Sequence, residues 1–167
     1  MIAATDVQYH DDHAIAACVL FDDWEDATPS HAWTVRVDEV AEYVPGQFYK
    51  RELPCLLQLL PPVLPELTLV IVDGYVWLGD ESHPGLGGHL WKALEQEIPV
   101  VGVAKTRFVG AAPVAEVVRG ESSNPLFVSA AGLSLSVAAE AVRGMHGAFR
   151  LPTLLKRVDS LCRGRAS

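Results

Sequence analysis

The sequence predicts an α/β domain with one mixed sheet, in which three antiparallel strands lead into parallel strands and helices flank the sheet. Strand-like segments separated by polar turns fill the first forty residues. An apolar run at 67–72, a helical segment and a second apolar run at 100–104 follow in an order that produces a parallel pair with a crossover. Half of the 167 residues are apolar, which is enough for one buried core and predicts a single domain over 1–167.

The antiparallel part of the sheet comes first. Residues 5–9, 14–21 and 33–37 are rich in apolar and β-branched side chains, and polar clusters at 11–12 and 22–30 separate them. In the third segment apolar residues alternate with polar ones, which is the period of a strand with one buried face. These three segments therefore predict an antiparallel meander.

A helix follows the meander. From Gly46 the apolar period changes, and leucines at offsets of three, four and seven mark one helical face. These residues are Leu53, Leu56, Leu57 and Leu60. Pro61-Pro62 predicts the end of the helix, because proline lacks the amide hydrogen that a helix interior needs.

The parallel part of the sheet begins with the run at 67–72. This run is apolar on both faces, as a central buried strand is, and it stops at Asp73-Gly74. A helix predicted over 87–97 leads to the second buried strand at 100–104, which Lys105 closes. An acidic residue and a basic residue therefore stand at the carboxyl ends of two neighbouring strands.

The last third of the chain completes the sheet and its cover. Shorter strands are predicted over 115–118 and 126–129, and two helices with apolar faces follow. The faces are formed by Leu135, Ala139, Val142 and Met145 in the first helix, and by Leu154, Leu155, Val158, Leu161 and Cys162 in the second.

Composition excludes several classes of protein. A mean hydropathy of +0.20 with 20% charged residues excludes a natively disordered chain. No apolar run approaches the roughly 20 residues of a membrane span, so we expect no membrane partner. The first apolar run follows acidic rather than basic residues, the reverse of a secretory signal, which predicts a cytoplasmic protein. Three widely spaced cysteines without a CxxC motif predict reduced thiols.

Charge is distributed unevenly along the chain. The net charge is −8, but residues 1–102 carry a net −13 and residues 103–167 a net +5. An acidic half beside a basic half fits a carboxylate metal site flanked by a surface that binds phosphate, and it equally fits ordinary surface variation.

Four residues stand where they could do chemistry. Asp6 on the first strand and Asp73 at the end of the first central strand are expected to be neighbours in a sheet of this order. Together with Glu52, early in the first helix, they could hold a hard cation such as Mg²⁺. Lys105 would lose hydration unless it pairs with a carboxylate or a phosphate. Each acid also has an ordinary interpretation, as a turn, helix-start or strand-end residue.

Eight short segments, in one order, resemble motifs of the endonuclease V family. They are Asp6-Val7-Gln8-Tyr9, Tyr43-Val44-Pro45-Gly46 followed by Arg51-Glu52-Leu53-Pro54, Val72-Asp73-Gly74, His83-Pro84, Gly102-Val103-Ala104-Lys105, Pro125-Leu126-Phe127-Val128-Ser129, and Arg150-Leu151-Pro152. The resemblance extends from about residue 4 to residue 163 and is in register with the predicted elements.

This resemblance implies a fold and an activity. The fold would be ribonuclease H-like, here a single domain that lacks the family's usual N-terminal helix. The activity would be that of a Mg²⁺-dependent endonuclease, with Mn²⁺ as a substitute, that cuts a phosphodiester bond near a deaminated purine. The partner would be nucleic acid, with deoxyinosine in DNA or inosine in RNA as the target, and the role DNA repair.

The resemblance also assigns roles to residues. Asp6, Glu52 and Asp73 would be the catalytic metal-binding carboxylates, with Asp159 a further acid near the metal. Lys105 would be the catalytic cation near the reacting phosphate. Four residues would bind substrate: Tyr43 as the wedge that stacks into the gap left by an extruded base, Gly46 and Gly74 where the backbone approaches that base, and His83.

The match departs from the family beside the base pocket. Residues 75–82 intervene so that His83 comes ten residues after Asp73, and Gly85 stands where the family has arginine. Glu42 precedes Tyr43 where proline is usual. The intervening segment contains Tyr75 and Trp77, which could form a second stacking platform or could pack locally. An intact catalytic set beside an altered recognition set predicts relaxed base specificity.

Two other functions stay open at the level of sequence. The altered pocket also fits a non-catalytic, nucleic-acid-binding relative of endonuclease V. The same carboxylates would serve an enzyme that acts on a small phosphorylated molecule. The sequence does not decide between DNA and RNA, nor does it determine the number of metal ions or the oligomeric state.

Overall fold

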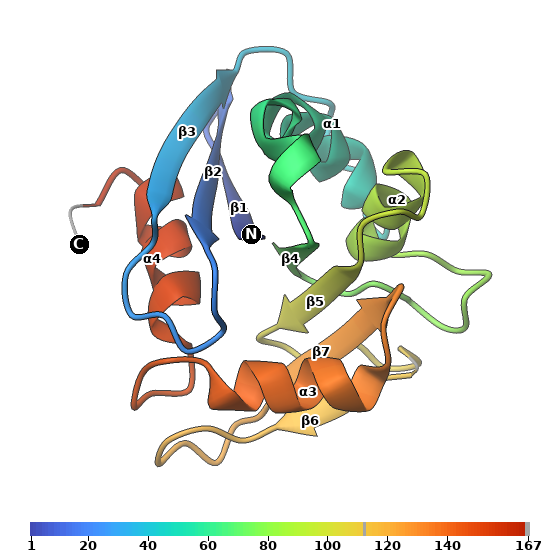
Figure 1. Cartoon of the computed structure of the whole chain (residues 1–167). Coiled ribbons are helices and arrows are strands. Elements are labelled where there is room, and N and C mark those ends of the chain that lie inside the picture. The colour runs from blue at the N-terminus through green and yellow to red at the C-terminus, as the bar shows by residue number, and fades with distance from the viewer. Residues whose placement is uncertain (112, 166–167) are drawn as a thin grey trace.

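One sheet organises the whole chain. The computed structural model describes residues 1–111 and 113–165. Within this part of the chain, seven strands form a sheet in the order β3-β2-β1-β4-β5-β7-β6 (Figure 1). The strands are β1 (Ile2–Tyr9), β2 (Ala14–Phe21), β3 (His31–Val37), β4 (Leu69–Asp73), β5 (Val100–Ala104), β6 (Ala115–Val117) and β7 (Leu126–Ala131).

Strand directions agree with the predicted mixed sheet. β1, β2 and β3 form an antiparallel meander, and β4 and β5 lie parallel to β1. Beyond β5 the sheet becomes antiparallel again, because β7 pairs antiparallel with β5 and β6 pairs antiparallel with β7. The parallel strands β1, β4 and β5 therefore lie in the centre of the sheet, where both of their faces are covered.

Helices cover the two faces of the sheet. They are α1 (Tyr49–Leu59), α2 (Leu86–Ala93), α3 (Leu135–Gly144) and α4 (Thr153–Cys162). Side chains from α1 and α2 join one apolar core, and side chains from α3 and α4 join another on the opposite face. Figure 1 shows α4 against the β1–β2 end of the sheet and α3 against β6 and β7.

Some boundaries differ from the predicted ones. The helix predicted over 87–97 ends at Ala93, because the backbone of Glu95 and Gln96 turns left-handed, with φ of 57° and 62°. Pro61-Pro62 ends the first helix, as predicted, and begins a short 3₁₀-helix, Pro61–Glu66. The three cysteines are buried and free, as expected for core thiols. None of the described helices has the length and apolar character that a bilayer span requires.

Candidate active site

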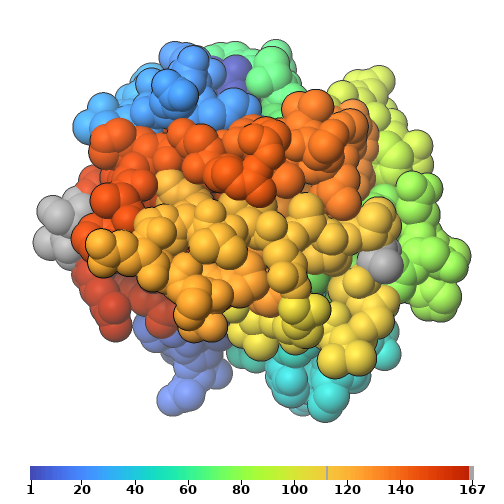
Figure 2. Space-filling model, turned by 90° about the horizontal axis from the view of Figure 1, so that it is seen from below, coloured from blue at the N-terminus to red at the C-terminus, as the bar shows by residue number. Residues whose placement is uncertain are grey.

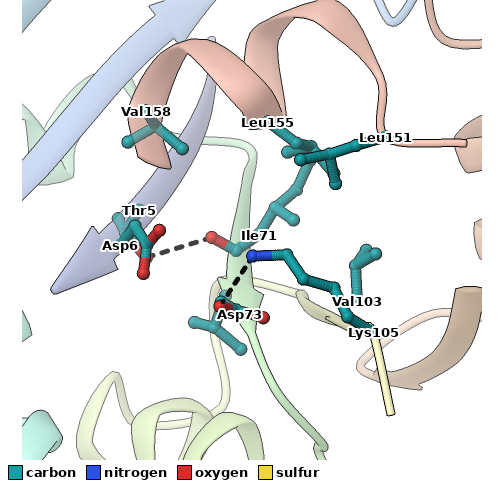
Figure 3. A pocket seen from close by; sticks show the side chains of 10 residues that line it. Thr5, Asp6, Ile71, Asp73, Val103, Lys105, Leu151, Leu155 and Val158 are labelled. Carbon is teal, nitrogen blue, oxygen red and sulfur yellow. Dashed lines mark hydrogen bonds and ion pairs between the residues drawn. The ribbon is translucent and has the colours of Figure 1, made fainter. Parts of the chain in front are cut away.

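Strand register brings Asp6 and Asp73 together. Ala4 of β1 pairs with Ile71 of β4, and each aspartate lies two residues beyond its strand's member of that pair. Because side chains alternate along a strand, both carboxylates face the side covered by α4. The hydroxyl of Thr5 donates to the carbonyl of Ile71 at 3.0 Å and ties the strands just before the carboxylates (Figure 3).

Lys105 enters the same group from β5. Val103 pairs with Asp73, and Lys105 lies two residues further on the same face. Its Nζ pairs with Asp73 (Figure 3), 3.4 Å from Oδ2, and lies 3.9 Å from Oδ1 of Asp159. Three neighbouring central strands thus contribute two acids and one base at adjacent positions.

Asp159 comes from α4, which packs across β1 and β2. Arg163, the residue that follows the last turn of α4, donates its Nε hydrogen to Oδ1 of Asp159 at 3.0 Å. Burial alone would raise the pKa of Asp159, but Arg163 and Lys105 outweigh it and lower the pKa below its ordinary value. Asp159 is therefore an ionised neighbour of the Lys105 amine.

Glu52 reaches the site from the other side of the sheet. It lies in the first turn of α1 and lines a cleft of about 610 Å³ together with Asp73 and Lys105. The other lining residues are Gly46, Phe48, Tyr49, Gly74, Tyr75, Leu78, Gly85, Leu86, Ala104, Thr106, Arg107 and Phe108. Figure 2 shows two of the contributing segments side by side, the cyan segment before α1 and the yellow segment after β5.

Two of the carboxyl groups resist ionisation. Burial, followed by the charge of Asp73, raises the pKa of Asp6 to about 7. The same two causes, in the same order, raise the pKa of Glu52 to about 8, and the charge of Asp6 adds to them. Arg51 opposes the shift of Glu52, and Lys105 opposes that of Asp6, without cancelling either. Burial and the neighbouring carboxylates therefore both disfavour the charged forms of Asp6 and Glu52.

This donor set suits a hard divalent cation. All four acids offer oxygen ligands, and their mutual repulsion is the kind that a bound Mg²⁺ relieves. In the described part of the chain, no three His, Cys, Asp or Glu side chains lie close enough to hold one ion as they stand. The chemistry of the side chains thus fits the metal, while the ligand geometry is not assembled.

The predicted substrate-binding residues separate into two groups. Gly46 and Gly74 both line the cleft, and both have positive φ, of 77° and 138°. Tyr43 is 53% exposed, and its ring lies 5.5 Å from that of Phe48, which lines the cleft. His83 is not part of the lining, because it lies in an exposed loop with its Nδ1 3.0 Å from Oδ1 of Asp80.

The aromatic character of the cleft was not predicted from the sequence. Phe48 and Phe108 adjoin two of the family motifs, but no period or spacing distinguishes an exposed phenylalanine on a loop from a buried one. Tyr75 and Trp77 prove to have different environments: Tyr75 lines the cleft, whereas Trp77 is buried and donates its indole hydrogen to the carbonyl of Ala130 at 3.1 Å. They do not form one platform.

The backbone after Asp73 packs closely against Gly102, which has no side chain to keep it away. A Cβ at Gly102 would lie 2.5 Å from the carbonyl oxygen of Gly74 and 2.8 Å from Oγ of Ser129. Ser129 is fully buried, and its Oγ accepts a hydrogen bond from the amide of Val76 at 2.9 Å. The turn that follows Asp73 therefore rests directly on β5 and β7, which determines where Asp73 and Gly74 face the cleft.

We expect Gly102→Ala to destabilise the protein by about 2–3 kcal/mol, because backbone atoms must shift to admit the methyl group. The melting temperature should fall by about 4–12 °C. Gly144→Ala is the matched control, because a Cβ at Gly144 meets nothing within 4 Å. Equal melting temperatures for Gly102→Ala and the unchanged protein would contradict this account of the close approach.

The chain is similar to known proteins over almost its whole length. The family model described as Endonuclease V matches residues 1–160. An endonuclease V of Streptomyces coelicolor is 31% identical over 188 aligned positions, which cover 97% of this chain and 77% of that protein. An endonuclease V of Xylella fastidiosa is 36% identical over 115 positions, which cover 66% of this chain and 45% of that protein.

Solved structures agree with the sequence comparisons. The crystal structure of Streptomyces avermitilis endonuclease V is 29% identical, with a TM-score of 0.74, and the match covers 98% of this chain and 79% of that one. Ciona intestinalis endonuclease V, in complex with a 24mer DNA containing an inosine followed by a ribo-adenosine, has the same fold, with a TM-score of 0.79 at 22% identity, and the match covers 98% of this chain and 84% of that one. The sheet is ribonuclease H-like, as the resemblance implied, and the chain belongs to the endonuclease V family.

Proposed function

We propose that this chain is a divalent-metal-dependent endonuclease that hydrolyses a phosphodiester bond in DNA or RNA near a deaminated purine, with relaxed dependence on the base. One observation carries the proposal: Asp6, Asp73 and Lys105 meet at adjacent positions of the central strands, and Glu52 shares a cleft with two of them. Family membership supports a nuclease that acts on nucleic acid. The inosine-containing DNA bound by the Ciona intestinalis relative supports the choice of base.

The acids of the site would hold the cation. Asp6, Glu52 and Asp73 are the proposed ligands, and Asp159 is a further acid near the proposed metal position. When bound, Mg²⁺ or Mn²⁺ lowers the pKa of an attacking water and neutralises charge that develops on the phosphate. Because their pKa values of about 7 and 8 keep Asp6 and Glu52 partly protonated near neutrality, both must release protons to serve as ligands.

Lys105 has a separate role in the proposal. Its ammonium group lies between Asp73 and Asp159, which hold it at the edge of the cleft. From there it would stabilise negative charge that develops on the phosphate oxygens in the transition state. Tyr43 and Phe48, both more than half exposed, would stack against bases beside the cut.

The test is cleavage of end-labelled single- and double-stranded DNA and RNA, each with and without one inosine, in Mg²⁺, in Mn²⁺ and in chelator. We expect metal-dependent cutting at a fixed position beside inosine and slower cutting elsewhere. Metal-independent cutting, or none on any strand, would overturn the proposal. The pattern of preferred strands would decide between DNA and RNA, and cutting beside inosine in DNA would support a role in repair.

We expect Lys105→Ala to lower the single-turnover cleavage rate by about 10²-fold, because it removes a positive charge aimed at the reacting phosphate. Lys105→Arg keeps that charge and should recover part of the rate. Lys92→Ala, on α2, is the matched control for loss of a lysine outside the cleft. A Lys105→Ala rate within threefold of the unchanged protein would exclude the assigned role.

A second candidate function is nucleic-acid binding without cleavage. It is favoured by the position of His83, which lies with Asp80 and Ser82 in an exposed loop instead of lining the cleft. Salt-sensitive binding without turnover at saturating Mg²⁺ and Mn²⁺ would support this function over the first.

A further inference from the structure

The hydroxyl group of Tyr75 forms two hydrogen bonds with the backbone of the segment after Lys105. The hydroxyl donates to the carbonyl of Thr106 at 2.6 Å and accepts from the amide of Phe108 at 2.9 Å. Both partners are backbone groups of the segment that follows Lys105. The phenol has one hydrogen to donate, so Tyr75 retains none for a ligand. What it offers to the cleft is its ring.

A second ring extends this surface. Phe108 lies with its ring centroid 6.0 Å from that of Tyr75, at an interplanar angle of 55°. Both rings line the cleft that contains Glu52, Asp73 and Lys105. Phe108 is 45% exposed, although burying a phenylalanine is favourable. An aromatic pair left partly open to water beside reactive groups is a surface that a flat apolar ligand can cover.

The segments that carry the pair also carry the proposed catalytic groups. Tyr75 lies two residues after Asp73, and Phe108 lies three residues after Lys105. A base stacked on these rings would therefore be attached to a backbone that passes close to both charged groups. The cleft of about 610 Å³ falls in the size range of small-ligand pockets, roughly 300–1,000 Å³.

We propose that Tyr75 and Phe108 form a stacking wall for one unpaired nucleobase of the substrate strand, which they bind by its face and without regard to its identity. This inference rests on the proposed function and names a feature of its substrate, an unstacked base beside the reacting phosphate. Every base has a flat π-surface, so stacking tolerates any sequence. A duplex must first release the base, so the wall favours single-stranded or mispaired sites.

The test measures binding of fluorescent single strands by anisotropy, with Ca²⁺ in place of Mg²⁺ and a gel to verify that the strands stay whole. The strands are oligo-dT, oligo-dA, and a mixed sequence with either one inosine or one guanosine. Tyr75→Ala and Phe108→Ala should each weaken binding of all four strands by a similar factor, about fivefold to a hundredfold. Tyr75→Phe keeps the ring and should weaken binding less than Tyr75→Ala.

Phe149→Ala is the matched control, because Phe149 is 74% exposed and does not line the cleft. Melting temperatures would show that the variants fold, and Phe108→Ala, which removes a partly exposed ring, keeps the test valid if Tyr75→Ala does not fold. Unchanged binding by Phe108→Ala and Tyr75→Ala would overturn the inference. So would a changed ratio between the inosine and guanosine strands, because the wall would then read a base edge.

These binding data, together with the cleavage assay, separate this inference from the proposed function. Metal-dependent cleavage by the unchanged protein, with binding unaffected in Tyr75→Ala and Phe108→Ala, would support the proposed function and contradict the stacking wall. Absence of cleavage, with binding weakened in both variants, would contradict the proposed endonuclease activity and support the stacking wall.

Discussion

Asp73→Asn will reduce the single-turnover rate of strand cleavage by at least about 10³-fold, the loss expected when several kcal/mol of transition-state stabilisation disappear. Asp73 is the acid that interacts with Lys105, Asp6 and Glu52. It pairs with Lys105 at 3.4 Å, and its charge contributes to the raised pKa values of both Asp6 and Glu52. Asparagine preserves the shape of the side chain and removes the charge, so both cation binding and the position of Lys105 suffer.

The fold should survive this change, because the Asp73 side chain is 37% exposed and a neutral amide costs little there. Asp38→Asn is the matched control, an exposed aspartate that pairs with Arg36 outside the cleft. Asp73→Asn protein that retains a tenth of the original cleavage rate under saturating metal would show that this carboxylate is not essential.

The metal-free protein will lose stability as the pH rises from about 5 to about 8. A carboxyl group whose pKa is higher in the folded chain binds more protons folded than unfolded. Its stabilising contribution is complete below the unfolded pKa, near 4, and is lost as the pH rises through the folded pKa. For Asp6 that folded value is about 7 and for Glu52 about 8. Thermal melts in chelator across this range would measure the loss.

Glu52→Gln removes the charge that causes part of this loss. At pH 8 the variant should unfold with a free energy higher by about 2–5 kcal/mol and melt at least about 5 °C higher than the unchanged protein, while at pH 5 the two should converge. Cleavage by the variant should fall to background. Stability and activity would then move in opposite directions, as expected where a site concentrates like charges for a cation.

Added Mg²⁺ or Mn²⁺ completes this test. At pH 8 either ion should raise the melting temperature of the unchanged protein, because it binds the folded site and not the unfolded chain. The ion should stabilise Glu52→Gln less. Glu66→Gln, at an exposed position on the 3₁₀-helix, is the control for loss of an acidic side chain elsewhere. A melting temperature that is flat with pH, or that increases, would contradict the assigned pKa values.

Local patterns in the sequence determined most of the architecture. The alternation at 33–37, the leucine spacing after Gly46 and the two apolar runs at 67–72 and 100–104 predicted the elements in their observed order. Such periods are properties of neighbouring residues, so a chain carries them before it folds. They also placed Asp73 and Lys105 at the ends of two adjacent central strands, from which their proximity follows by strand register alone.

Only the tertiary structure decided what surrounds these residues. The approach of Asp159 to Lys105 depends on how α4 packs across the sheet, and the raised pKa of Glu52 depends on burial between segments far apart in the chain. Loop conformations that no period encodes bring the rings of Tyr75 and Phe108 together and keep His83 out of the cleft. Sequence spacing records order along the chain, whereas electrostatics and cavity shape depend on distances through space, and folding sets those.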